Sequence, residues 1–482
     1  MNWYTVGVIV YIVILVLIVL RVLFETHSTS KTLAYILLCL FLPFGGMVFY
    51  LLFGINYWKK RRYSRKMRLN SGLLDHLRKN IAQYEKSAVK SSNLPVEKNA
   101  ELARMLIRDL ESPLTTFNDL KLLVNGECKF PELLEAIRNA KNHVHLEYYI
   151  YECDKTGSEL IELLIKKAKE GIAVRFIYDD FGSPTIKKKL ERQMRDAGIE
   201  IHPFHKVRFY LLANRLNYRN HRKIVIIDGD TAFTGGINVS DKYVNTEGKN
   251  KLFWRDTHLM LKGPAVYYLQ YIFITDWNFC CSKQLVADLS HFPDTKPGAD
   301  DGYVQIAAGG PDSPLPTILY SILQAIYLAE EEILLTTPYF IPGDSLMDAL
   351  CVAAMSGVKV KLLVPGVCDS RFVNAASKSY YTRLLMAGAE IYLYQKGFVH
   401  AKTMVTDGKL SMIGTANMDN RSFDLNFEVN AIVYNTGFAR QMRELFLNDL
   451  KDATQIDKDR WLSRPWYEQL PEKLARLFSP VL

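Results

Sequence analysis

Two long runs of apolar residues without a charged side chain open the chain. Residues 1–20 are dominated by Val, Ile and Leu, and residues 32–58 are again uncharged, with one Pro and two Gly near the middle. About 20 apolar residues in a helix cross the roughly 30 Å hydrocarbon core of a bilayer. A secretory signal peptide would need a basic start and a small-residue cleavage site, and neither is present. The pattern predicts a two-helix transmembrane hairpin over residues 1–58, with spans at about 3–20 and 34–56.

Basic residues are concentrated directly after the second run. Residues 59–68 hold seven Lys or Arg and no acid, whereas the loop between the runs holds only Arg21 and Lys31. Because basic flanks remain in the cytoplasm, we expect a two-span cell-membrane protein whose catalytic part is cytoplasmic. The block accounts for seven of the nine net positive charges, so the near-neutral remainder disfavours nucleic acid as a partner. We expect residues 59–110 to form a basic juxtamembrane region and connector that suits anionic membrane lipids.

From about residue 111 the chain alternates between helical and strand-like stretches, as is typical of an α/β protein. Strand-like stretches at 144–150 and 171–178 each follow a helical stretch, and the same order returns at 333–340 and 357–364. Recurrence at this distance predicts an internal duplication.

One motif occurs in each half of this region. Residues 221–228 read H-R-K-I-V-I-I-D and residues 400–407 read H-A-K-T-M-V-T-D, so a Lys and an Asp follow each His at matched positions. A Gly follows each Asp, and Asn238 and Asn417 stand 17 positions after their His residues. Two matches of this length indicate a shared functional unit.

These residue types suit chemistry at a phosphate diester. His221 and Lys223 stand two positions apart before an apolar stretch and project on one face of a strand, as do His400 and Lys402. If the halves pack about a pseudo-twofold axis, the four side chains converge on one pocket. Two ammonium groups and two Asn amides would stabilise the phosphate charge. One imidazole could attack phosphorus while the other protonates the leaving alcohol.

Each imidazole needs a carboxylate that fixes its tautomer. Asp256 lies 35 residues after His221, and Glu428 lies 28 residues after His400. We therefore expect each acid to orient the His of its own half. No cluster of acids suited to magnesium or zinc accompanies the motifs, and the seven Cys form no C-x-x-C pair. We expect neither a metal nor a cofactor.

The duplicated His-x-Lys-x4-Asp motif with a downstream Gly-x-Asn resembles the phospholipase D superfamily, from about residue 111 to the end of the chain. The double membrane span, W-R-D-T-H at 254–258, T-P-Y-F at 337–340 and the tail A-R-L-F-S-P at 475–480 resemble the bacterial cardiolipin synthases more closely. This resemblance implies transfer of a phosphatidyl group from one phosphatidylglycerol to the hydroxyl of another, with release of glycerol, through a phosphohistidine.

The resemblance also implies roles for individual residues. His221 would be the nucleophile and His400 the acid and then the base, although the reverse assignment remains open. Asp228 and Asp407 match the motif acids, which in the family mainly hold the site together. The expected catalytic set is His221, Lys223, Asp228, His400, Lys402 and Asp407, with Asn238 and Asn417 binding the substrate phosphate.

The expected fold is therefore α/β, with two duplicated phospholipase D-like domains at 111–295 and 296–482 behind the transmembrane hairpin. The expected partners are phosphatidylglycerol and anionic membrane lipids, whereas the oligomeric state stays open. A membrane phospholipase D that uses water, or another phosphatidyltransferase, remains the alternative, because these enzymes differ only in what attacks the phosphohistidine.

The C-terminal tail has helical periodicity. Leu470, Leu474, Leu477 and Phe478 fall on one face of a helix, while Lys473 lies off that face. Such a helix either caps the second domain or lies on the bilayer and presents lipid to the site. The pattern alone leaves both interpretations open.

Overall fold

The computed structural model of the chain describes residues 3–25, 29–42, 44–50, 94–110, 112–204, 218–245, 252–286, 288–293 and 302–479. The described elements fall into two compact units. The first contains α1 (Trp3–Glu25), α2 (Thr29–Phe41) and α3 (Gly45–Phe49), and the second contains the elements from α6 (Leu94–Lys98) onward.

α1 is long and apolar enough to cross a membrane. Its 23 residues extend about 35 Å at 1.5 Å per residue, and most of its Val, Ile and Leu side chains are exposed. A helix that is apolar on every side suits lipid as its surroundings. The first expected span, 3–20, lies inside this helix, which alone among the described residues has such length and composition.

The second expected span, 34–56, is interrupted within the described residues. α2 ends at Phe41, and Phe44 adopts a left-handed backbone with φ of 58°. With 13 residues, α2 extends only about 20 Å, less than the hydrocarbon core. Gly46 allows α3 to lie against α2, because a Cβ there would be 2.2 Å from the Leu38 carbonyl oxygen. The expected span beyond Tyr50 lies outside the described residues, so the hairpin stays a prediction.

The second unit is built on one long mixed sheet. From one edge to the other its strands are β19 (Ala453–Gln455), β13 (Glu390–Tyr394), β12 (Lys359–Pro365), β10 (Glu332–Thr336), β15 (Thr403–Thr406), β16 (Leu410–Gly414), β18 (Glu428–Tyr434), β9 (Gly302–Gly309), β1 (Thr115–Val124), β8 (Thr257–Lys262), β6 (Thr231–Gly235), β5 (Ile224–Ile227), β2 (His143–Tyr148), β3 (Ala173–Tyr178) and β4 (Glu200–Pro203).

The strand order recurs on the two sides of the central β1–β9 pair. Outward from that pair the order is β8-β6-β5-β2-β3-β4 on one side and β18-β16-β15-β10-β12-β13 on the other. The neighbours β2, β3 and β4 are parallel, as are β10, β12 and β13. The predicted α/β class is confirmed, and the strand-like stretches of the sequence correspond to β2, β3, β10 and β12.

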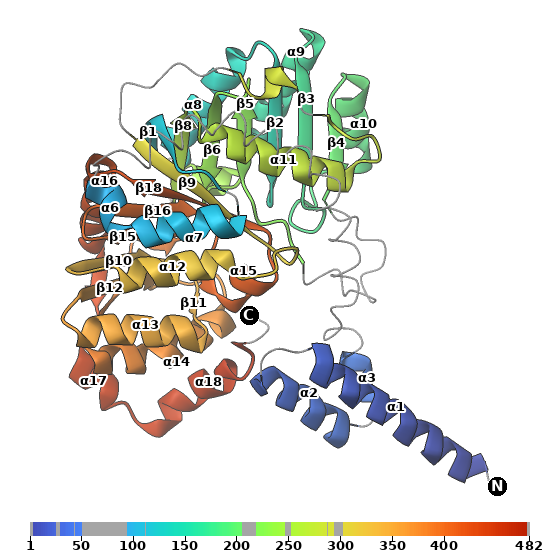
Figure 1. Cartoon of the computed structure of the whole chain (residues 1–482), viewed down its shortest axis with the longest axis vertical. Helices are drawn as coiled ribbons and strands as arrows, with labels where there is room; N and C mark the ends of the chain where they lie inside the picture. The colour runs from blue at the N-terminus through green and yellow to red at the C-terminus, as the bar shows by residue number, and fades with distance from the viewer. Residues whose placement is uncertain are drawn as a thin grey trace. The chain divides into compact units, whose positions relative to one another are not determined.

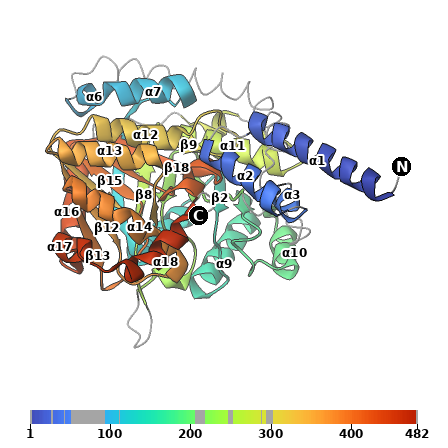
Figure 2. The same cartoon turned by 90° about the horizontal axis from the view of Figure 1, so that it is seen from below.

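Helices cover the sheet (Figure 1). The remaining helices are α7 (Ala100–Leu110), α8 (Asn125–Arg138), α9 (Lys155–Lys169), α10 (Lys188–Asp196), α11 (Val266–Cys280), α12 (Thr317–Tyr327), α13 (Asp344–Met355), α14 (Arg371–Ala387), α15 (Asn420–Asp424), α16 (Thr436–Leu450), α17 (Lys458–Leu462) and α18 (Trp466–Arg476). The short strands are β7 (Phe253–Arg255), β11 (Phe340–Ile341), β14 (Gly397–Val399) and β17 (Met418–Asp419). Figure 2 shows α7 on the outer side of α12.

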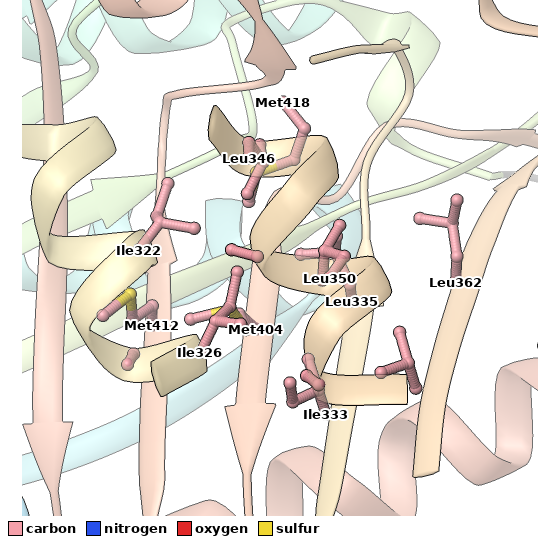
Figure 3. Close-up of a cluster of buried hydrophobic side chains, with 14 of the residues drawn as sticks. Ile322, Ile326, Ile333, Leu335, Leu346, Leu350, Leu362, Met404, Met412 and Met418 are labelled. Carbon is pink, nitrogen blue, oxygen red and sulfur yellow. The ribbon is translucent and has the colours of Figure 1, made fainter. Parts of the chain in front are cut away.

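The core of the second half lies between α12, α13 and the strands beneath them. Figure 3 shows Ile322 and Ile326 of α12 and Leu350 of α13 together with side chains of β10, β12, β15 and β16. Full burial of each such side chain contributes about 1.5–3 kcal/mol. A matching core joins β2, β3 and β5 to α8 and α9 in the first half. These two cores hold the strands that follow the motifs.

Candidate active site

The two motifs stand at equivalent positions of the sheet. β5 follows Lys223 directly and β15 follows Lys402, and all four residues of β5 are buried. The side chains of His221, His400 and both lysines are themselves buried. Basic groups out of contact with water require hydrogen-bond partners or opposite charges nearby.

Backbone pairing between the halves brings the motifs together. β14 pairs in parallel with β7, and the His400 amide donates a hydrogen bond to the Arg255 carbonyl oxygen at 2.7 Å. In the same way Asn220 forms an isolated parallel β-bridge with Phe427, and the His221 amide donates a hydrogen bond to the Phe427 carbonyl oxygen at 2.9 Å. Each His therefore lies beside the residue that precedes an acid of the opposite half.

The imidazoles are paired with carboxylates across the halves. Nδ1 of His221 lies 2.9 Å from Oε1 and 3.0 Å from Oε2 of Glu428, and Nδ1 of His400 lies 2.7 Å from Oδ2 of Asp256. The expected pairing of each acid with the His of its own half is therefore wrong. The parallel pairing of the preceding segments, rather than distance along the chain, determines which acid meets which imidazole. A carboxylate that accepts the Nδ1 hydrogen leaves the Nε2 lone pair free.

The two lysines occupy equivalent places beside the imidazoles. Lys223 Nζ donates to the His221 carbonyl oxygen at 2.7 Å. Lys402 Nζ donates to the His400 carbonyl oxygen at 2.5 Å and lies 3.0 Å from Nδ1 of His400. An ammonium group has three donors, so each lysine has further donors to offer an anion.

Burial lowers the pKa of all four basic groups. Loss of water lowers the pKa of His221 to about 4, although the nearby Glu428 carboxylate raises it. Burial and the Lys402 ammonium lower the pKa of His400 to about 3. Burial also lowers the pKa of Lys223 to about 7 and that of Lys402 to about 8. Both imidazoles are thus neutral near pH 7, the form that a nitrogen nucleophile needs.

The motif acids hold the backbone at the other end of each strand. Asp228 accepts hydrogen bonds from the amides of residues 141–143 at 2.8, 2.7 and 3.0 Å. Asp407 accepts from the amides of residues 330–332 at 3.0, 2.8 and 3.0 Å. Asp228 has φ of 52° and Gly229 has φ of 74°, as the two central residues of a type I′ turn require. Both acids therefore bind the backbone at the turn after the strand, as expected of residues that hold the site together.

The two motif asparagines have protein partners of their own. Asn238 accepts from the Ile150 amide at 3.1 Å and donates to the Tyr243 hydroxyl at 2.8 Å. Asn417 donates to Asp419 Oδ2 at 3.0 Å. A primary amide has two N–H donors, so each Asn has at most one N–H left for a phosphate.

Aromatic rings around the imidazoles were missed by the sequence analysis. The Tyr149 ring centroid lies 4.6 Å from that of His221. Around His400 the centroids of Trp254, Phe398 and Tyr243 lie at 5.5, 5.8 and 5.9 Å. Trp254 lies on β7, two positions before Asp256, and Phe398 lies on β14, two positions before His400. This matched spacing of an aromatic residue before each site residue is visible in the sequence. These rings exclude water and so contribute to the lowered pKa values.

A buried polar network behind His221 was also missed. Arg222, where the second motif has Ala401, donates to the Glu428 carbonyl oxygen at 3.2 Å and forms an ion pair with Asp276. Asn220 donates to Glu147, whose pKa is raised by burial and by Asp276. The network supports the His221 side of the site and has no counterpart at Ala401.

The described residues contain no group of three or more His, Cys, Asp or Glu that could hold a metal ion. The cationic side chains that contact the two imidazole residues are Lys223 and Lys402. The arrangement therefore offers two nucleophile or acid–base groups, two cations and two orienting acids.

Two family models match the chain. The model described as "Cardiolipin synthase, PLD-like domain" matches residues 133–277 and 322–450. The model described as "Phospholipase_D-nuclease N-terminal" matches residues 9–54. The two parts of the first match contain one motif each.

Known proteins resemble the chain over nearly its whole length. The cardiolipin synthase of Geobacillus kaustophilus is 40% identical over 470 residues, which cover 97% of this chain and 92% of that protein. The major cardiolipin synthase ClsA of Bacillus subtilis is 40% identical over 474 residues, 98% of each chain. The crystal structure of phosphatidylserine synthase from Haemophilus influenzae has a similar fold, with a TM-score of 0.60 and 13% identity over 79% of this chain and 100% of that chain.

Proposed function

The chain belongs to the cardiolipin synthases with phospholipase D-like domains, and we propose that it joins two phosphatidylglycerol molecules into cardiolipin with release of glycerol. The enzyme is a phosphatidyltransferase with phospholipid substrates, and it is membrane-associated. One observation supports the detailed mechanism most strongly: two buried imidazoles, each held through Nδ1 by an acid of the opposite half, lie beside two buried lysines.

We propose that His221 is the nucleophile, as the family resemblance implies. Its Nε2 lone pair attacks phosphorus, the P–N bond forms, and the P–O bond to the headgroup glycerol breaks. His400 enters each cycle as the imidazolium, a form that the anionic phosphate of the bound substrate favours. It gives its Nε2 proton to the leaving glycerol oxygen and, now neutral, takes the proton of the glycerol hydroxyl of the second phosphatidylglycerol, which regenerates the imidazolium. That oxygen attacks the phosphohistidine, which releases His221. Lys223 and Lys402 stabilise the phosphate oxygens throughout.

The halves that carry the motifs are proposed to be duplicated domains, 111–295 and 296–482, related by a pseudo-twofold axis. The recurring strand order around β1 and β9 supports this proposal, as does the reciprocal pairing of each His with the opposite acid. The partners are proposed to be phosphatidylglycerol and anionic lipids, without nucleic acid.

Product analysis tests the proposed reaction. Full-length protein in vesicles receives phosphatidylglycerol labelled in the terminal glycerol, and the products are separated and identified. We expect labelled cardiolipin and labelled free glycerol in equal amounts. Phosphatidic acid in place of cardiolipin would instead identify a phospholipase D, and a requirement for another alcohol would identify a different phosphatidyltransferase.

The rate should decrease as the pH rises above neutrality. Lys223 and Lys402 are cationic below their pKa values of about 7 and about 8, so raising the pH through that interval removes both charges from the free enzyme. Because kcat/KM reports the free enzyme, it should fall by about tenfold or more between pH 7 and 9.5. The measurement is kcat/KM for phosphatidylglycerol as a function of pH. Lys402→Arg serves as the control, because arginine keeps its positive charge at position 402 over the whole range. A profile that is flat to pH 9.5 would contradict the assigned role of the lysines.

We propose two membrane spans with both domains in the cytoplasm. In a chain that carries Ser28→Cys, an impermeant thiol reagent added to intact cells should label residue 28, whereas Ser64→Cys should remain unlabelled because basic flanks stay inside. Both positions lie outside the described residues. The parent chain, with its seven cysteines, provides the background. Labelling at residue 64 and not at residue 28 would contradict the proposed orientation and indicate the reverse one.

A further inference from the structure

α18 packs on the protein through a narrow side and turns its large apolar side chains outward. Glu472 and Ala475, the buried side chains of this helix, face α14. The opposite side exposes 73% of Trp466, 53% of Leu474 and 74% of Leu477. Surface helices normally bury their apolar stripe, so the orientation of α18 is the reverse of that of an ordinary capping helix.

Specific polar contacts fix this orientation. Arg464 donates to both oxygens of Glu472, at 2.8 and 3.0 Å, and such a bidentate pair is directional. The Arg476 guanidinium lies 5.1 Å from the centroid of the Tyr380 ring on α14. These contacts hold Glu472 to the segment before α18 and Arg476 to α14, and they favour the orientation in which the leucines face outward.

The exposed apolar side continues onto the start of α14. The ring centroids of Phe478 and Phe372 lie 5.4 Å apart, and each side chain is about half exposed. We call this surface the docking face. It consists of Trp466, Leu470, Leu474, Leu477, Phe478 and Phe372.

The docking face lies beside the candidate active site. The Ser479 carbonyl oxygen accepts a hydrogen bond from Asn420 at 3.2 Å, three residues after the motif residue Asn417. Asp369, three residues before Phe372, accepts a hydrogen bond from Tyr339, whose ring contacts Phe398 next to His400. Few side chains therefore separate this face from the imidazole.

We propose that the docking face binds the surface of an anionic phospholipid bilayer and delivers lipid headgroups to the site. This inference rests on the proposed function, because delivery of headgroups from a bilayer requires that the substrate be a membrane lipid. Trp466 and Tyr467 suit the headgroup layer, where amphipathic rings concentrate. Lys473 is exposed at the edge of the apolar face, a position that suits contact with anionic headgroups. The exposed leucines of α18 would then reach the boundary between headgroups and acyl chains.

The test uses the full-length chain in phosphatidylglycerol vesicles. The variant is the triple substitution Leu470→Ser, Leu474→Ser and Leu477→Ser, and the matched control is Val352→Ser with Met355→Ser, two exposed apolar residues of α13. For the variant, the apparent KM for phosphatidylglycerol per unit of vesicle surface should rise about tenfold or more. Its rate on monomeric short-chain phosphatidylglycerol and its thermal midpoint should stay unchanged, and the control should match the parent in every measurement.

Several outcomes would overturn the proposal. An unchanged KM on vesicles would exclude lipid docking. Equal loss on vesicles and on monomeric lipid, with a lower thermal midpoint, would show that α18 only caps the domain. A dimer of the parent that dissociates in the variant would assign the face to a second copy of the chain.

A binding measurement separates this proposal from the proposed function. Bromine-labelled acyl chains should quench the fluorescence of the parent more than that of the Trp466→Phe variant, whether or not the enzyme makes cardiolipin. Equal quenching in both would overturn the docking, whereas quenching without any product from either lipid form would overturn only the proposed reaction.

Discussion

His221→Ala and His400→Ala should each reduce turnover by roughly 10⁴-fold or more, because groups that act as a unit lose most of their effect when one is removed. The structure supports treating the two imidazoles as a unit, since each contacts an acid of the opposite half. The measurement is cardiolipin formation in vesicles by the full-length variants. As control, His202→Ala replaces an imidazole outside the site, whose ring contacts Trp277.

The two variants should nevertheless fail at different steps. A phosphatidyl ester with a nitrophenol leaving group needs no acid to depart, so the His400→Ala enzyme should still form the phosphohistidine on His221 and release one equivalent of nitrophenol. The His221→Ala enzyme should release none. A burst from His221→Ala alone would reverse the proposed assignment of nucleophile and acid. Full cardiolipin synthesis by either variant would contradict the two-motif mechanism altogether.

Sequence reasoning reached the residues of the site because the chemistry is local to each motif. The alternation around β5 and β15 placed His and Lys on one face, and the repeated spacing identified both copies. The Asp-Gly pair at residues 228–229 also has a local origin, since a tight turn needs two residues with positive φ. The backbone contacts of Asp228 could not be predicted, because its partners lie more than 80 residues away along the chain.

The errors share a different physical cause. The hydrogen bond between His221 and Phe427, like that between His400 and Arg255, joins segments far apart in the sequence. Spacing along the chain contains no information on such a pairing, so each acid was assigned to the nearer His. The same limit applies to α18, whose periodicity revealed an apolar stripe but not which side faces the protein. In the second apolar run, composition does not reveal that α2 ends at Phe41 or that Phe44 has a left-handed backbone.

The crossed acid–imidazole pairs lead to the second large effect. Asp256→Asn and Glu428→Gln should each lower cardiolipin synthesis by about 10²- to 10⁴-fold. An amide can present its NH₂ group to Nδ1, which favours the tautomer with the hydrogen on Nε2 and removes the lone pair from the reacting nitrogen. Glu428 is fully buried and holds His221 with both oxygens, so its replacement leaves Nδ1 with the uncharged Thr415 carbonyl oxygen at 3.2 Å. As control, Asp288→Asn breaks an Asp–His contact of 2.8 Å with His291 outside the site and should leave the rate unchanged.

The nitrophenol ester then shows which acid supports which imidazole. Because Asp256 contacts His400, the Asp256→Asn enzyme should still attack phosphorus with His221 and give a nitrophenol burst close to that of His400→Ala. Because Glu428 contacts His221, the Glu428→Gln enzyme should show a burst at least about 100-fold slower. The opposite result, a burst lost in Asp256→Asn and kept in Glu428→Gln, would mean that each acid serves the His of its own half. Loss of both bursts with a lowered thermal midpoint would show that the acids mainly hold the two halves together. The burst rates of the two variants therefore show which acid supports the attack by His221. They report the first chemical step alone, before the second phosphatidylglycerol takes part.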